Sequence, residues 1–224
     1  MRQLYLPMRI WDLPIRLFHW AIVVLLGFSW LSAEIGTGFW MRLHVLSGLT
    51  ILAMLLFRVI WGFIGSDTAR FTRFLKSPME AFRHLGHMTR READTEIGHN
   101  AAGGWMVLGL LALLAFQVAT GLCANDDAMT EGPLALRVGK ETSDWLTHLH
   151  DLNFKLIQIA VVLHVLAVIA YRVLKGQNLL TPMITGKKRL PGNTRAPVMM
   201  HPVLGLAVFA LSALAVFVFT RFFP

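Results

Sequence analysis

The chain has 224 residues, 55% of them hydrophobic, and a formal net charge of +8. Its mean hydropathy of +0.57 is too apolar for an ordinary soluble domain and indicates an integral membrane protein. The basic residues lie between apolar segments, which favours contacts with membrane lipid, and we expect no nucleic-acid partner. The single cysteine, Cys123, excludes an internal disulfide, a covalently attached c-type haem and an all-cysteine iron–sulfur cluster.

Five apolar segments are long enough to cross about 30 Å of hydrocarbon. In chain order, their approximate bounds are 15–33, 40–63, 101–122, 149–174 and 202–222. The first has no convincing small-residue cleavage site after it, so we interpret it as a membrane span and not as a cleavable signal peptide. The predicted fold class is an all-α integral membrane helix bundle.

The charges of the connecting segments alternate along the chain. The N-terminus and the second and fourth connections are basic, whereas the third connection is acidic, with Asp126, Asp127, Glu131, Glu141 and Asp144. The positive-inside rule then predicts that the N-terminus is cytoplasmic and that the C-terminus lies on the outer side of the membrane. Within the second connection, residues 77–91 have the pattern of a short amphipathic surface helix, with Ser77 as its cap and Pro78 in its first turn.

Three of the apolar segments carry histidines, and these are the most informative residues of the chain. His150 and His164 lie on the fourth segment, where fourteen helical steps return to within roughly 40° of the same face after a rise of about 21 Å. His19 lies on the first segment and His44 on the second. Ionisable side chains inside a membrane are costly, so they indicate a functional site.

Pairing these histidines by depth gives two metal centres. The predicted topology places His19 with His164 on the cytoplasmic side and His44 with His150 on the outer side. His148 is the weaker choice for the outer ligand, because sixteen helical steps place it about 160° from His164. A single membrane histidine more often forms hydrogen bonds between helices, but four that match in depth favour ligation.

Haem is the cofactor that suits two pairs of imidazoles. Two axial histidines saturate the iron, which favours electron transfer over oxygen activation. The haem propionates need cations, for which the inner candidates are Arg16, Arg58 and Arg172 and the outer candidates are Arg42 and Lys155. Contact with lipid headgroups is an equally good explanation for each of these cations.

Several motifs together resemble the bacterial di-haem cytochrome b family, which includes the cytochrome b561 type and the b-type cytochrome subunit of nickel–iron hydrogenases. They are WDLPIRLFHW, HVLSGLTILAMLLFRVIWGFIGSDTARF, GHNAAGGWMVLGLLALLAFQVATGL, ANDDAMTEGPLA and HLHDLNF followed by LHVLAV. The resemblance covers about residues 9–175. It implies that histidines of the first, second and fourth spans hold two b haems, and these map onto His19, His44, His150 and His164.

The resemblance also implies electron transfer between the membrane quinone pool and a periplasmic partner, such as a cytochrome c or a redox subunit. Quinone is therefore a further candidate ligand. We expect a four-helix di-haem domain over 1–175, a basic cytoplasmic linker over 176–200 and a fifth transmembrane helix over 201–224. Alternatives are an autonomous superoxide:quinone oxidoreductase, whose cationic entrance Arg42, Arg137, Lys140 and Lys155 would supply, a hydrogenase membrane anchor, and a haem-free scaffold or transporter. A homodimer through the fifth span stays open.

Overall fold

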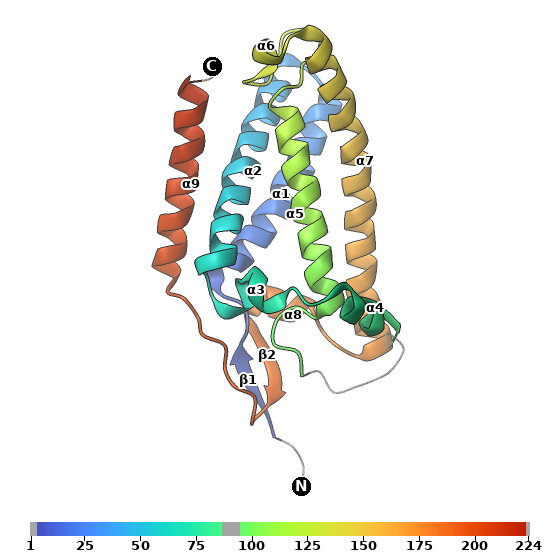
Figure 1. The fold of residues 1–224 in the computed structure, drawn as a ribbon, viewed down its shortest axis with the longest axis vertical. Helices are drawn as coiled ribbons and strands as arrows, with labels where there is room; N and C mark the ends of the chain where they lie inside the picture. The colour runs from blue at the N-terminus through green and yellow to red at the C-terminus, as the bar shows by residue number, and fades with distance from the viewer. Residues whose placement is uncertain (1–3, 87–94, 223–224) are drawn as a thin grey trace. The chain divides into compact units, whose positions relative to one another are not determined.

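The computed structural model describes residues 4–86 and 95–222, and its main elements are long helices (Figure 1). Those that are long and apolar enough to cross a membrane are α1 (Leu13–Ile35), α2 (Gly38–Ile64), α5 (Ala101–Gly121), α7 (Lys140–Ala170) and α9 (Pro202–Phe222). The π-helical turn Tyr171–Lys175 continues α7. The predicted all-α membrane helix bundle is therefore confirmed.

Four of these helices begin and end within two residues of the predicted bounds, whereas α7 differs. It begins at Lys140, well before the predicted start at residue 149. Polar side chains account for the extension: Ser143 donates a hydrogen bond to the carbonyl of Cys123 at 2.6 Å, and the Thr147 hydroxyl accepts one from the amide of Asn125 at 3.0 Å. Because these side chains are not apolar, the hydrophobic pattern begins later than the helix.

The chain divides into two compact units, and each of the five long helices contributes residues to both. The first unit comprises Met1–Leu17, Val59–Gly109 and Val161–Leu206, and the second comprises Phe18–Arg58, Leu110–Ala160 and Ala207–Pro224. The shorter helices are η1 (Asp67–Ala69), α3 (Phe71–Phe74), α4 (Pro78–Gly86), α6 (Ala135–Val138) and α8 (Leu180–Thr185). The predicted surface helix is represented by α4, and residues 87–91 of that prediction lie outside the described residues.

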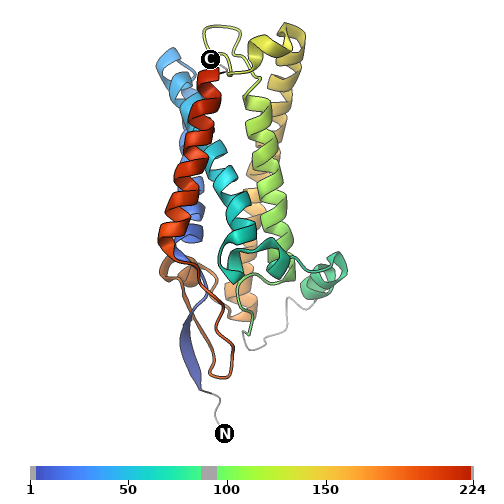
Figure 2. The same cartoon turned by 60° about the vertical axis from the view of Figure 1, so that its left-hand side comes forward.

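A small antiparallel sheet in the first unit joins the N-terminal segment to the segment before α9. Strand β1 (Tyr5–Arg9) pairs with β2 (Lys187–Pro191), from Tyr5 opposite Pro191 to Arg9 opposite Lys187 (Figures 1 and 2). The segment 176–200, which we expected to be a linker, therefore contains a helix and a paired strand. The pairing depends on backbone hydrogen bonds between distant segments, which leave no local hydrophobic pattern in either strand.

A buried carboxylate fixes the start of α1 in the first unit. Asp12 is 3% exposed, and its Oδ1 accepts a hydrogen bond from the amide of Ile15 at 2.8 Å, as an N-cap residue does. Its Oδ2 accepts a second hydrogen bond, at 3.0 Å, from the indole of Trp61, a side chain with no exposed surface. Asp12 thereby joins the first turn of α1 to the end of α2.

Large apolar side chains cover the outer faces of the long helices. Exposed examples occur on each of them: Val24, Leu46, Phe116, Leu163 and Leu211. In water such surfaces would drive association, whereas in hydrocarbon they face a solvent of their own polarity. The exposed faces therefore agree with a multi-pass membrane protein.

Candidate functional site

His44 enters a cavity of the second unit from α2, and the backbone fixes its orientation. The imidazole Nδ1 lies 2.8 Å from the carbonyl oxygen of Ser29 and 3.2 Å from the Ser29 hydroxyl. A carbonyl oxygen only accepts hydrogen bonds, so Nδ1 carries the proton and donates it. In the neutral ring this leaves the lone pair on Nε2, the atom that can bind a metal.

His150 is held in the same way from α7. Its Nδ1 lies 2.9 Å from the carbonyl oxygen of Gln117 on α5, and the Thr120 hydroxyl is 3.3 Å away. The same reasoning assigns the proton to Nδ1 and leaves Nε2 available for a metal. Both predicted ligands of the outer centre therefore have an anchored ring and the tautomer that ligation requires.

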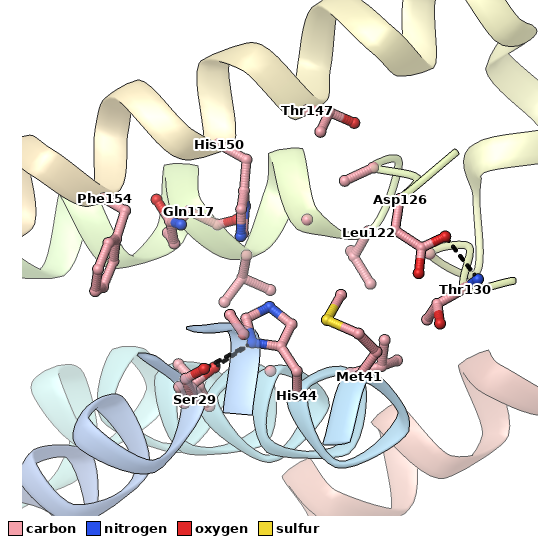
Figure 3. A pocket seen from close by; sticks show the side chains of 18 of the residues that line it. Ser29, Met41, His44, Gln117, Leu122, Asp126, Thr130, Thr147, His150 and Phe154 are labelled. Atoms are coloured by element: carbon pink, nitrogen blue, oxygen red, sulfur yellow. Dashed lines mark hydrogen bonds between the residues drawn. The ribbon is translucent and has the colours of Figure 1, made fainter. Parts of the chain in front are cut away.

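The two rings face each other across the cavity (Figure 3). Their centroids are 6.1 Å apart, with an angle of 80° between the ring planes. Two imidazoles that bind one metal from opposite sides, each with a metal–nitrogen distance of about 2 Å, have ring centres about 6 Å apart. The separation of the His44 and His150 rings thus fits two imidazoles that would hold one metal between them.

The cavity around these histidines has the size and character of a cofactor site. Its volume is about 470 Å³, and apolar side chains such as Leu26, Leu49, Leu114 and Phe154 line much of it. Cofactor pockets commonly measure about 300–1,000 Å³ and are mainly apolar with a few polar groups. Gly121 belongs to the lining, and a Cβ at this position would lie 2.8 Å from Cε1 of His150.

The charged side chains that line the described part of this cavity are acidic. They are Glu34, Asp126 and Asp151, and no lysine or arginine is among the described lining residues. Arg42 and Lys155, our candidates for the outer propionates, are thus outside the lining. Arg42 turns back along α2 and donates to the carbonyl of Gly38 at 3.2 Å, and Lys155 lies about 140° around α7 from His150.

Hydrogen bonds donated to its carboxylate determine the ionisation of Asp126. Its Oδ1 accepts hydrogen bonds from the backbone amides of Ala128, Met129 and Thr130 at 2.8–3.0 Å. Partial burial acts to raise the pKa of Asp126, but these amides stabilise the charged form and leave the pKa below its ordinary value. The carboxylate is therefore ionised near neutral pH and adds negative charge to the lining.

The other predicted site residues are divided between the two units. His19 and Arg58 belong to the second unit: His19 is half-buried on α1 with its ring edge-on to Trp20, and Arg58 is buried on α2. His164, Arg16 and Arg172 belong to the first unit. His164 is half-buried on α7, Arg16 donates to the carbonyl of Ile184, and Arg172 is exposed. The roles of these residues remain predictions.

Sequence reasoning missed the groups that hold the outer pair. The carbonyls of Ser29 and Gln117 are backbone atoms, and no residue type signals their position. Asn153, which is 4% exposed, donates to the Gln117 side chain at 2.7 Å and to the carbonyl of Leu113 at 3.0 Å. Because Asn153 lies one turn beyond His150, a polar residue on the histidine face was the signal that could have identified it.

The donor set fits haem better than a bare metal ion. A transition metal in a protein commonly takes four or more ligands, whereas this site presents two opposed imidazoles in an apolar cavity. Haem supplies four equatorial nitrogens itself and needs two axial donors. The membrane-spanning helices and the anchored histidine pair define a membrane b-type cytochrome that acts in electron transfer.

Comparisons with known proteins identify the family. The chain belongs to the prokaryotic cytochrome b561 family, whose model matches residues 10–186. It is also similar to the probable Ni/Fe-hydrogenase B-type cytochrome subunit of Bradyrhizobium diazoefficiens. The two are 21% identical over 214 residues, which cover 80% of this chain and 85% of that protein. No solved structure matches the chain significantly.

Proposed function

We propose that the protein is a di-haem cytochrome that passes electrons across the inner membrane between the quinone pool and a periplasmic redox partner. The observation that carries the proposal is the opposed pair His44 and His150, whose Nδ1 atoms are both held by backbone carbonyls. Haem bound there would supply one-electron redox chemistry. His44 and His150 would hold the haem iron through their Nε2 atoms, which would leave no open coordination site for oxygen or substrates.

The proposal also assigns a second haem to His19 and His164, as the sequence predicts. Its support is the matching depth of the two residues in the predicted topology and the half-buried position of each ring in an apolar helix. The proposal assigns both haems to the four-helix domain over 1–175. It treats α9 and the segment before it as an addition to that domain.

The carboxylates around the outer cavity favour a redox partner whose docking surface is positively charged. Glu34, Asp126 and Asp151 line the cavity, and negative charge at a docking site speeds the approach of a basic protein such as a cytochrome c. The same carboxylates would repel superoxide. This charge pattern therefore favours the protein partner over an autonomous superoxide:quinone oxidoreductase.

A hydrogenase-linked role is the second candidate. The similar Bradyrhizobium protein carries the name of a Ni/Fe-hydrogenase B-type cytochrome subunit, so a hydrogenase could be the periplasmic partner that exchanges electrons with this chain. The orientation we propose, with the acidic connection on the periplasmic side, is compatible with either partner. Co-purification from native membranes distinguishes them, because a dedicated subunit remains bound and a diffusing cytochrome c does not.

The first test is the haem content of the purified protein, from its reduced-minus-oxidised spectrum and a pyridine haemochrome assay. We expect about two low-spin b haems per chain. His44→Ala and His150→Ala should each remove one haem and leave the other. His148→Ala is the matched control, since this exposed histidine lies in the same turn of α7 and should leave both haems in place.

The possible results separate the two haem assignments. If the wild-type protein contains one haem, and both His44→Ala and His150→Ala lose it, the result would support the outer site and reject the pairing of His19 with His164. Protein made with ample haem that contains none would reject electron transfer altogether.

A further inference from the structure

A second cavity of about 470 Å³ lies in the first unit, away from the residues assigned to haem. Two segments form most of it: the turn and short helix that follow α2, and the extended segment before α9. Its lining includes three arginines, Arg70, Arg73 and Arg195, the carboxylate of Asp67, and apolar side chains such as Phe74 and Val198. Neither the histidine pairs nor the proposed electron transfer uses these residues.

Hydrogen bonds hold the two segments together. The Asp67 amide donates to the carbonyl of Val198 at 3.0 Å, and the Asp67 Oδ2 accepts from the amide of Val198 at 2.9 Å. The buried hydroxyl of Ser66 accepts from the amide of Met200 at 2.9 Å. These contacts fix the segment that carries Arg195 beside the turn that carries Arg70 and Arg73. Hydrogen-bonded structure within the unit therefore forms the cavity.

The charges of the lining do not balance. Asp67 Oδ1 lies 3.7 Å from Arg70 Nη1 and 3.9 Å from Arg73 Nε, and its other oxygen is used by Val198. In the part of the chain that the structure describes, Arg195 has no carboxylate within ion-pair distance. Three guanidinium groups therefore face one carboxylate. Guanidinium groups bind phosphate through paired hydrogen bonds, so a phosphate-bearing anion would complete the site.

The position of the cavity indicates the source of the phosphate. It lies just past the end of α2 at Ile64 and just before the start of α9 at Pro202, where a membrane span meets the headgroup layer. Phe74, Ile97 and Val198 add apolar surface beside the arginines. Basic cavities next to membrane spans commonly bind the headgroups of anionic lipids. We propose that this cavity binds a phosphate-bearing anion, supplied by the headgroup of an anionic phospholipid.

The test uses the haem-loaded full chain in neutral detergent. Binding of phosphatidylglycerol and of phosphatidylcholine is measured by native mass spectrometry and by the shift of the thermal unfolding midpoint. We expect phosphatidylglycerol to bind preferentially, and Arg195→Gln to weaken its binding about fivefold. Arg73→Gln combined with Arg195→Gln should weaken it further. Arg189→Gln is the matched control, because this exposed arginine of β2 is not a lining residue of the cavity.

A parallel titration with inorganic phosphate, against chloride at equal ionic strength, separates the two sources. In one outcome, inorganic phosphate stabilises the wild type but not Arg195→Gln, while phosphatidylglycerol binds no better than phosphatidylcholine. That result would support an anion site whose ligand is a soluble phosphate and not a lipid headgroup. The proposal is overturned if neither ligand is preferred, or if Arg189→Gln weakens binding as much as Arg195→Gln. The lipid comparison on the wild type needs no variant, so a variant that fails to fold does not prevent the test.

Discussion

Gly121 leaves the space that the ring of His150 occupies. A Cβ at this position would lie 2.8 Å from Cε1 and 3.1 Å from Nδ1 of the imidazole. The glycine lies on α5 one turn beyond Gln117, whose carbonyl accepts the Nδ1 hydrogen. The close approach of α5 to His150 and the hydrogen bond that orients the ring therefore depend on the same stretch of helix.

Replacing Gly121 with alanine should disturb this arrangement. The added methyl group forces the ring of His150 or the backbone of α5 to move, at a cost of about 1–3 kcal/mol for overpacking. We expect Gly121→Ala to lose the outer haem more readily on heating, seen as an earlier decay of its visible absorbance. Gly109→Ala is the control on the same helix, because a Cβ there meets no atom within 4 Å. Equal haem retention in the two variants would contradict the prediction.

The spans could be predicted because the membrane imposes a simple pattern on the sequence. A helix that crosses hydrocarbon must be predominantly apolar, so α9 was predicted at its observed bounds, Pro202–Phe222. Where polar contacts between elements stabilise a helix, this pattern gives no signal. Ser143 and Thr147 extend α7 through bonds to the segment around Asn125, and only the structure reveals those partners.

The candidate site was also predictable only in part. His44 and His150 are conspicuous because an ionisable group in a span is costly. A helical period and a depth argument predicted that they form a pair, and the structure places their ring centroids 6.1 Å apart. The carbonyls that orient their rings are backbone atoms, so no residue type marks them. Arg42 and Lys155 were chosen by depth alone, which does not specify the direction of a flexible side chain. The pairing of Tyr5 with Pro191 is equally invisible in the sequence.

Asn153 should matter to the outer site although it is not a ligand in the proposal. Its side chain is buried and donates to the Gln117 side chain and to the carbonyl of Leu113. Asn153→Ala removes both bonds, which should lower the free energy of unfolding by about 1 kcal/mol. It should also loosen the segment of α5 that orients His150, so we expect a shift in the reduction potential of the outer haem by redox titration.

Gln158→Ala provides the comparison for Asn153→Ala. This amide lies on the same helix but is exposed, so its loss should not shift the reduction potential of the outer haem. A potential that shifts equally in the two variants would show that Asn153 has no specific role at the site.

The loop that begins at Asp126 should be sensitive to acid. The pKa of Asp126 lies below its ordinary value because three backbone amides donate to the charged carboxylate, and this outweighs the opposing effect of burial. A depressed pKa in the folded state contributes stability above the unfolded pKa of about 3.9, and that contribution is lost as the pH falls through the folded pKa. We expect Asp126→Asn to destabilise the protein at pH 6 and to lose this effect progressively as the pH falls below the ordinary pKa of about 3.9.

Thermal unfolding midpoints of wild type and Asp126→Asn, measured from pH 6 down into the acid range, check the prediction. The difference between the two proteins should shrink steadily as the pH falls. Glu131→Gln, a nearby exposed carboxylate, should show a smaller difference at pH 6. A constant difference between wild type and Asp126→Asn would mean that the carboxylate charge does not stabilise the loop.

Asp12 and Trp61 should be energetically coupled. Asp12 caps α1 and also accepts the indole hydrogen of Trp61. Asp12→Ala loses a cap worth about 1 kcal/mol and leaves a buried N–H unsatisfied at a further cost of about 1–3 kcal/mol. In a Trp61→Phe background no indole hydrogen is left to satisfy, so the same substitution should cost only the cap. The free energies of unfolding of wild type, the two single variants and the double variant give the coupling energy. The control is Glu141→Ala, at an exposed acidic residue in the first turn of α7, which should leave the free energy of unfolding unchanged in both backgrounds. Additive costs for Asp12→Ala and Trp61→Phe would show that the two side chains stabilise α1 and α2 independently.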